Sequence, residues 1–238
     1  MPISPVRHTA ALPLEEAELD RYRDLQQLAY RCLRLAAGRL RAGMTEREAA
    51  DLLRLTFASA GVHDFAHRPQ VRIGPARRSA LLPGAGPRLR PGTVVLLRCT
   101  PRLGPYAAPA VLTRPFGPSP EAERLHAELP SYRGLLLDEV RGGASPERLC
   151  AATAAFAARR GHLLAAPVLP SPVAPTRPAR PAAPPSAPDA PVPPGLWALT
   201  LRLTAGPAQA AFAELLAVTS HAACWLDDDL PHAGPPAH

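Results

Sequence analysis

The sequence lacks or is short of several residue types, and these shortages limit what the protein can be. It contains no lysine and no asparagine, and isoleucine occurs only at positions 3 and 73. All 27 basic residues are therefore arginine, a bias typical of GC-rich coding sequence, so the net charge of +7 is a weak sign of nucleic-acid binding. The arginines are scattered and are not interleaved with aromatic residues, which disfavours nucleic acid as a partner.

Cysteine is scarce and dispersed. Cys32, Cys99, Cys150 and Cys224 form no C-x-x-C pair, which argues against zinc knuckles and redox motifs and predicts reduced thiols. No apolar run approaches the roughly 20 residues that a membrane helix requires, and the first residues lack the apolar core of a signal peptide. The sequence therefore predicts a cytoplasmic protein without a membrane partner.

What is present is enough for a folded domain. The chain has 238 residues, of which 47% are hydrophobic, and this suffices for one substantial core. Apolar residues recur at spacings of three and four, and hydroxyl residues stand where helix N-caps are expected. A kink is expected at Pro130, whose ring removes one backbone hydrogen bond. The predicted helices cover residues 14–42, 45–60, 120–141 and 146–160.

Residues 89–117 predict a β-hairpin. Pro91 and Gly92 form a turn, because proline presets one turn dihedral and glycine supplies the other. The β-branched run at 93–97 is typical of a strand that is buried on both faces. Residues 106–116 then predict a returning strand.

This hairpin resembles the metal-binding hairpin of the pita-bread metallopeptidases, the family of creatinase, prolidase, aminopeptidase P and methionine aminopeptidase. In that family the first strand follows a Pro-Gly turn and ends on a metal-binding Asp, and the second carries Gly-Tyr, another metal Asp and a Thr-Arg ending. The resemblance implies an α+β pita-bread fold of two pseudo-symmetric αβ halves with a curved, mostly antiparallel sheet. The residues that match the family's frame are Gly92, Gly104, Tyr106, Thr113, Arg114 and, later, Gly195.

An internal duplication agrees with two similar halves. A glycine, a capping hydroxyl two residues later and a closing glycine mark the second predicted helix, and the same spacing marks the last one. The two patterns are Gly43-x-Thr45 with Gly61, and Gly143-x-Ser145 with Gly161.

The predicted organisation is one domain between flexible ends. We expect an N-terminal arm over residues 1–12, a pita-bread-like domain over 13–226 and an acidic, proline-rich tail over 227–238. The halves of this domain are predicted at 13–117 and 118–226.

A proline-rich insertion interrupts the second half. Residues 167–194 hold 12 prolines within 28 positions, many at the three-residue repeat of polyproline II. One interpretation is an exposed inserted loop without helix or sheet. The alternative is a ligand for an SH3-like or WW-like partner.

The resemblance also implies where metal ligands would stand, and the carboxylates are missing there. The first Asp falls on Arg98, and the second on Pro109 or Val111, depending on the direction of counting. The first metal Glu falls on Leu201, and Glu214 lies within a residue of the second, which leaves it as a relic ligand. The hairpin holds no Asp, Glu or His, and no H-G-x-G motif supplies the histidine.

The family's reaction uses two divalent ions (Mn, Co or Zn) that activate a shared water. One glutamate cannot hold two such ions, and the charge of Arg98 would repel them. We therefore predict no metal cofactor and no catalytic residue, hence a pseudo-aminopeptidase that acts by binding a peptide or protein, with a homodimer as one form of interaction. Two alternatives remain: an active Xaa-Pro-type or methionine-type aminopeptidase with its ligands elsewhere, and an arginine- and proline-rich scaffold protein.

Overall fold

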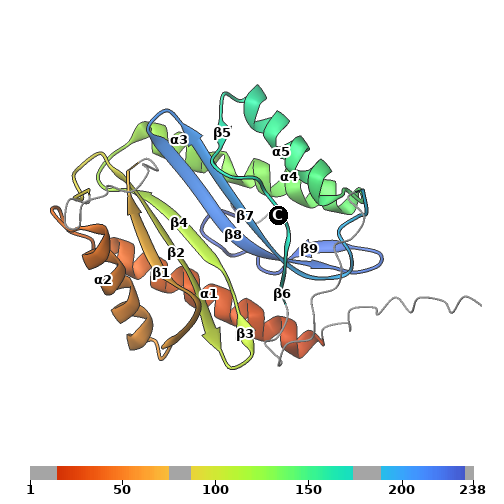
Figure 1. Ribbon diagram of the computed structural model, residues 1–238, viewed down its shortest axis with the longest axis horizontal. Coiled ribbons are helices and arrows are strands. Elements are labelled where there is room, and N and C mark those ends of the chain that lie inside the picture. The colour runs from red at the N-terminus through yellow and green to blue at the C-terminus, as the bar shows by residue number, and fades with distance from the viewer. Residues whose placement is uncertain (1–14, 75–86, 174–188, 234–238) are drawn as a thin grey trace, which may run out of the picture.

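The computed structural model describes residues 15–74, 87–173 and 189–233. Helices and antiparallel strands alternate along the chain in two similar runs (Figure 1). The helices are α1 (Glu16–Gly38), α2 (Glu46–Ser59), α3 (Pro120–Ala127), α4 (Leu129–Arg141) and α5 (Pro146–Arg159). The predicted helix over 120–141 is thus divided into α3 and α4, with Pro130 in the first turn of α4, where proline is tolerated because that amide needs no helical partner.

The strands form two antiparallel sheets. In the first, β2 (Val94–Leu103) pairs with β1 (Asp64–Ile73), β3 (Tyr106–Ala107) and β4 (Ala110–Pro115). In the second, β7 (Gly195–Ala205) pairs with β5 (Leu163–Leu164), β6 (Ser171–Val173) and β8 (Ala208–Val218), and β8 also pairs with β9 (Ala223–Trp225). The hairpin predicted over 89–117 is therefore present, with its returning strand split into β3 and β4.

Capping residues explain where the matching helices α2 and α5 begin. The Thr45 hydroxyl accepts a hydrogen bond from the Glu48 amide, and the Glu48 carboxylate caps the Thr45 amide in return. At the start of α5 the Ser145 hydroxyl likewise accepts a hydrogen bond from the Arg148 amide. Gly61 and Gly161 follow the two helices with φ near +79° and +72°, a left-handed conformation that favours glycine.

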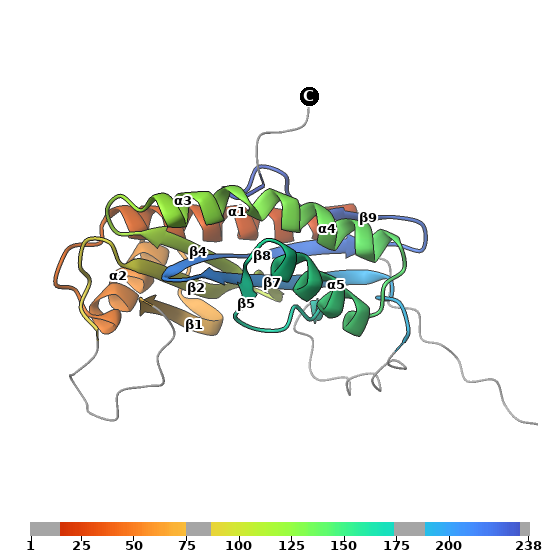
Figure 2. The ribbon, with the colours of Figure 1, turned by 90° about the horizontal axis from the view of Figure 1, so that it is seen from above.

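The helices α1, α3 and α4 lie along one side of the strands (Figure 2). Helices α1 and α2 bury apolar residues against the first sheet, and α3, α4 and α5 bury theirs against the second. Tyr22 and Leu25 of α1 also cluster with Leu196 and Leu215 of the second sheet. Leu97 of β2 and Phe212 of β8 are completely buried within these two clusters. The arrangement leaves the opposite sides of β2, β4, β7 and β8 turned away from those three helices.

The two sheets meet where β4 packs against β8, and side chains take the place of ladder hydrogen bonds there. The Tyr30 hydroxyl donates to the Ala213 carbonyl and accepts from the Ala213 amide, at 2.9 and 3.1 Å. Gln26 accepts from the Leu215 amide and donates to the Pro109 carbonyl. Buried backbone groups need such partners, so these residues of α1 fix how the halves meet.

The proline-rich segment corrects part of the prediction, because it is not devoid of sheet. Ser171–Val173 forms β6, which pairs with β7 at the side opposite β8. Pro172 is compatible with such an edge position because an edge strand does not require every amide in a ladder. Val168 and Val192 are buried in the core cluster. Residues 174–188, which carry most of the polyproline pattern, lie outside the described residues.

The chain also packs beyond residue 226, where the sequence predicts a tail. Leu230 and His232 are 5% and 7% exposed and join the helix side of the molecule. Among the residues that the structure describes, no helix is both long enough and apolar enough to span a membrane.

Candidate functional site

Strand alternation places Arg98 on the side of β2 that faces away from α1. Val95, Leu97 and Cys99 point into the cluster formed with α1 and α2, so Leu96 and Arg98 point the other way. Val111 of β4 lies directly opposite Arg98 in the β2–β4 ladder. The structure thus pairs the first implied Asp position with Val111, one of the two alternatives for the second.

The second sheet contributes to the same side. Arg202 of β7 is paired with Ala211 of β8, and Ala211 and Ala213 form a buried cluster with Leu96 and Val111 of the first sheet. We call this cluster the apolar floor. Arg72 of β1 joins from the first sheet, since its ladder partner is Leu96.

These three arginines define what we call the arginine face: Arg72, Arg98 and Arg202, beside the apolar floor. Burial lowers the pKa of Arg202 from its ordinary value, and the positive charges of Arg98 and Arg72 lower it further. Guanidinium groups remain protonated at physiological pH despite such shifts. The face therefore concentrates positive charge around a half-buried cation.

Acidic side chains neutralise only part of this charge. Arg72 lies 3.4 Å from Glu46, a contact in which the arginine is largely exposed. Arg98 and Arg202 form no ion pair with any residue in the described ranges. All 20 Asp and Glu residues of the sequence fall within those ranges, so the rest of the chain holds no Asp or Glu side chain that could supply a partner.

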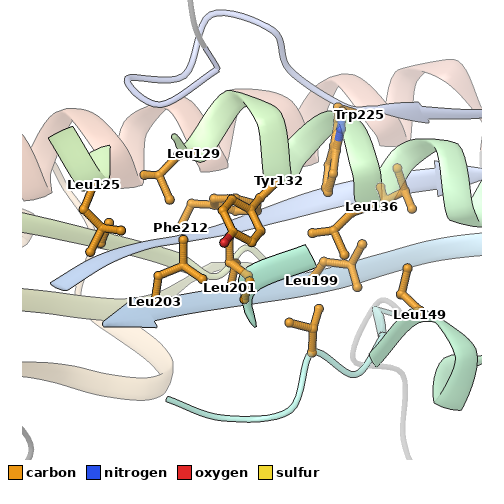
Figure 3. Close-up of a cluster of buried hydrophobic side chains, with 14 of the residues drawn as sticks. Leu125, Leu129, Tyr132, Leu136, Leu149, Leu199, Leu201, Leu203, Phe212 and Trp225 are labelled. Carbon is orange, nitrogen blue, oxygen red and sulfur yellow. The ribbon is translucent and has the colours of Figure 1, made fainter. Parts of the chain in front are cut away.

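Leu201 and Glu214, two other positions suggested by the resemblance, lie on the opposite side of the second sheet. Leu201 is completely buried among side chains of the helix-side cluster, such as Phe212 and Tyr132 (Figure 3). Glu214 points to the same side, toward α4. Pro109 lies between β3 and β4, where its carbonyl accepts the Gln26 hydrogen bond.

Most residues that match the family's frame shape turns or make packing contacts. Gly92 and Gly104 occupy turns with φ of 83° and 58°, and Tyr106 packs edge-on against Tyr22 with ring centroids 5.0 Å apart. Thr113 is fully buried and accepts from the Ala211 amide at 3.1 Å, which links β4 to β8. Gly195 begins β7, and Arg114 of β4 is exposed beside a cavity.

Glu214 is the centre of a buried polar network. Its carboxylate accepts from the Arg133 guanidinium at 2.9 and 3.0 Å, and Nε2 of His232 lies 2.5 Å from the same carboxylate. Arg133 also donates to the Asp227 carbonyl and to the Asp228 carboxylate. The network holds residues 227–232 against α4 and β8.

The cavity beside Arg114 lies on the helix side of the molecule, between α1, α3, β4 and the last described residues. Its volume is about 320 Å³, and its ionisable lining residues are Arg34, Arg114, Glu123, His126 and His232. His126 makes a 2.8 Å hydrogen bond to the Thr113 hydroxyl. Burial lowers the pKa of His126 to about 4, and the nearby charges of Arg114 and His232 act in the same direction.

His126 should therefore make stability depend on pH. The unfolded histidine titrates near pH 6.5 and the folded one near 4, so stability is fully present above about 6.5 and is lost as pH falls toward 4. The loss is at most about 3–4 kcal/mol, because one pKa unit corresponds to about 1.4 kcal/mol. Urea unfolding of wild type and His126→Gln at pH 7 and pH 4.5 should show a smaller pH-dependent loss in the variant. The exposed His63→Gln is the control, and an equal loss in wild type and His126→Gln would contradict the assignment.

The side chains of the arginine face do not fit a divalent metal. Guanidinium groups are positively charged and offer no lone pair, and the apolar floor offers none either. Within the described residues, no group of three or more His, Cys, Asp or Glu is arranged to hold a metal ion.

Arg72 and Arg202 are functional candidates that the sequence reasoning missed. A signal for Arg202 was present, since Leu199, Leu201 and Leu203 alternate with polar residues in β7. That alternation assigns the leucines to the core and Arg202 to the other side. Counting positions from Gly195, as the resemblance suggested, gave Leu201 as the ligand position and so overlooked Arg202.

Comparison with known proteins agrees with this architecture. The model of metallopeptidase family M24 matches residues 20–175. No curated protein matches the chain in sequence.

Solved structures resemble the chain over nearly its whole length. An X-Pro aminopeptidase from Thermotoga maritima has a TM-score of 0.68 at 20% identity, covering 90% of this chain and 62% of its own. A dipeptidase from Mycobacterium ulcerans has a TM-score of 0.66 at 18% identity, covering 92% of this chain and 59% of its own. Proline aminopeptidase P II from Yersinia pestis has a TM-score of 0.67 at 15% identity, covering 92% and 58%. These likenesses confirm the predicted pita-bread fold, and the chain spans only about 60% of the length of these proteins.

Proposed function

This chain belongs to metallopeptidase family M24, and we propose that it is a non-catalytic member that lacks the family's pair of metal ions and acts by binding a peptide or protein. The observation that carries the proposal is the pairing of Arg98 with Val111 across β2 and β4. The resemblance implies an Asp at the first position and supports one at the second. A cation and an alkyl group there cannot replace two carboxylates.

In this proposal Arg202, and not Leu201, is the residue of β7 that stands nearest the lost site, because it shares a side of the sheets with Arg98. Glu214 then has a structural role, since Arg133 and His232 engage its carboxylate on the other side. The fold would then provide a binding surface without the metal ions that activate water.

The test measures metal and turnover together. The purified protein is incubated with Mn²⁺, Co²⁺ or Zn²⁺, freed of excess ion, and assayed for bound metal and for hydrolysis of Xaa-Pro and Met-Xaa peptides. We expect no stoichiometric metal and no turnover. Stoichiometric metal with hydrolysis that a chelator abolishes would establish the alternative, an active aminopeptidase with its ligands elsewhere.

A variant gives this test a positive arm. Arg98→Asp combined with Val111→Asp places two carboxylates on ladder partners, whose Cβ atoms lie about 5 Å apart. Mn²⁺ affinity that appears in the double variant and is absent from wild type would support the proposed position of the lost site.

A further inference from the structure

Two of the three cations of the arginine face, Arg98 and Arg202, form no ion pair with any residue that the structure describes. Arg98 is exposed and Arg202 is half-buried, and the one carboxylate that pairs with the face, Glu46, contacts Arg72. A partly desolvated charge without a counter-ion costs free energy, and like charges nearby add to that cost. Such an arrangement is stabilised by an anion.

The buried apolar floor strengthens this preference. Leu96, Val111, Ala211 and Ala213 are each at most 7% exposed, so the guanidinium groups stand beside a low-dielectric surface. Electrostatic attraction to a ligand is stronger there than over a fully solvated surface. Guanidinium groups also present paired donors that match a carboxylate in a bidentate geometry.

The spacing of the arginines favours an extended ligand over a single small ion. Arg72 and Arg98 lie on neighbouring strands and are diagonal to each other in the ladder, which places such residues roughly 7–8 Å apart. Arg202 belongs to the other sheet. A ligand that engages all three must therefore carry more than one negative group and cross from β1 to β7.

We propose that the arginine face binds acidic peptide segments, whose Asp or Glu carboxylates pair with Arg98 and Arg202 and draw Arg72 from its exposed contact with Glu46. This inference rests on the proposed peptide-binding function and names the class of peptide. Arginine stands here where the resemblance implies a carboxylate, so the charge of the site is reversed. A surface that repels divalent cations attracts carboxylates.

The experiment uses two matched fluorescein-labelled peptides, one of alternating Glu and Ala and one of alternating Gln and Ala, with the full chain. Fluorescence anisotropy at low salt should show the Glu peptide binding at least about tenfold more tightly, because its carboxylates accept charge-assisted hydrogen bonds from guanidinium groups and the Gln amides are uncharged. Added NaCl should weaken the binding. Arg98→Gln and Arg202→Gln should each reduce affinity for the Glu peptide severalfold, whereas Arg31→Gln, an exposed change on α1, should leave it unchanged. Circular dichroism and thermal unfolding check that each variant is folded.

Several outcomes would overturn the inference. If the Glu and Gln peptides bind equally, the preference for acidic peptides is wrong while peptide binding itself stands. If Arg31→Gln weakens binding as much as Arg202→Gln, the attraction comes from overall charge. Binding of tripolyphosphate by wild type but not by Arg202→Gln, without binding of the Glu peptide, would assign the face to a small anion. If neither peptide binds, this inference is wrong, and metal content with turnover decides the non-catalytic assignment separately.

Discussion

Replacing Glu214 by Gln should reduce the free energy of unfolding by about 3–5 kcal/mol, because it leaves the Arg133 charge buried without its main counter-ion. The Glu214 carboxylate is fully buried, and the Arg133 side chain is 11% exposed. The amide of Gln would also direct a donor at groups that donate to the present carboxylate. Urea unfolding monitored by circular dichroism measures the loss.

The matched control is Asp228→Asn, which removes another carboxylate bonded to the same guanidinium. Asp228 is 77% exposed, and exposed ion pairs contribute less than about 1 kcal/mol. Arg133→Met combined with Glu214→Leu should cost less than the sum of the two single changes, because neither charge is then left alone. Equal losses for Glu214→Gln and Asp228→Asn would show that the buried pair does not stabilise the protein.

Local signals in the sequence predicted where the helical segments and the hairpin lie, although the segment over 120–141 is two helices. Capping hydroxyls such as Thr45 and Ser145 act through backbone groups only three residues away, so a short window contains all the information needed. The β2–β4 pairing followed from a turn and two apolar runs that are close in sequence. The resemblance to the metallopeptidases also predicted that these helices and strands combine into two similar halves.

Features that depend on distant partners were not predictable in this way. Glu214 lies in a strand whose residues are almost all apolar, so alternation cannot tell which side it faces. Its orientation is fixed by Arg133, which is 81 positions away, and by His232, which the sequence assigned to a tail. Burial of Asp227, Leu230 and His232 likewise depends on elements that are distant in the sequence, such as α4 and β8.

The assignment of sides in β7 leads to the prediction with the largest effect. Leu201→Glu should destabilise the protein by more than about 4 kcal/mol, because it places an ionisable group in a fully apolar, completely buried position. A domain of ordinary stability has about 5–15 kcal/mol in total, so this variant should be largely unfolded or insoluble at 37 °C. Leu201→Ala, which creates a cavity without a charge, should cost about 2–5 kcal/mol and remain measurable by urea unfolding.

Arg202→Glu is the decisive comparison, since it puts the same new side chain one residue further along the strand. There it would lie on the arginine face, next to the positive charges of Arg98 and Arg72, and like-charge repulsion would be replaced by attraction. We therefore expect Arg202→Glu to fold with stability equal to or above that of wild type, while losing affinity for acidic peptides. A stable Leu201→Glu together with an unstable Arg202→Glu would show that the strand faces the other way. The pair thus tests, by stability alone, which residue of β7 faces the core and which belongs to the arginine face.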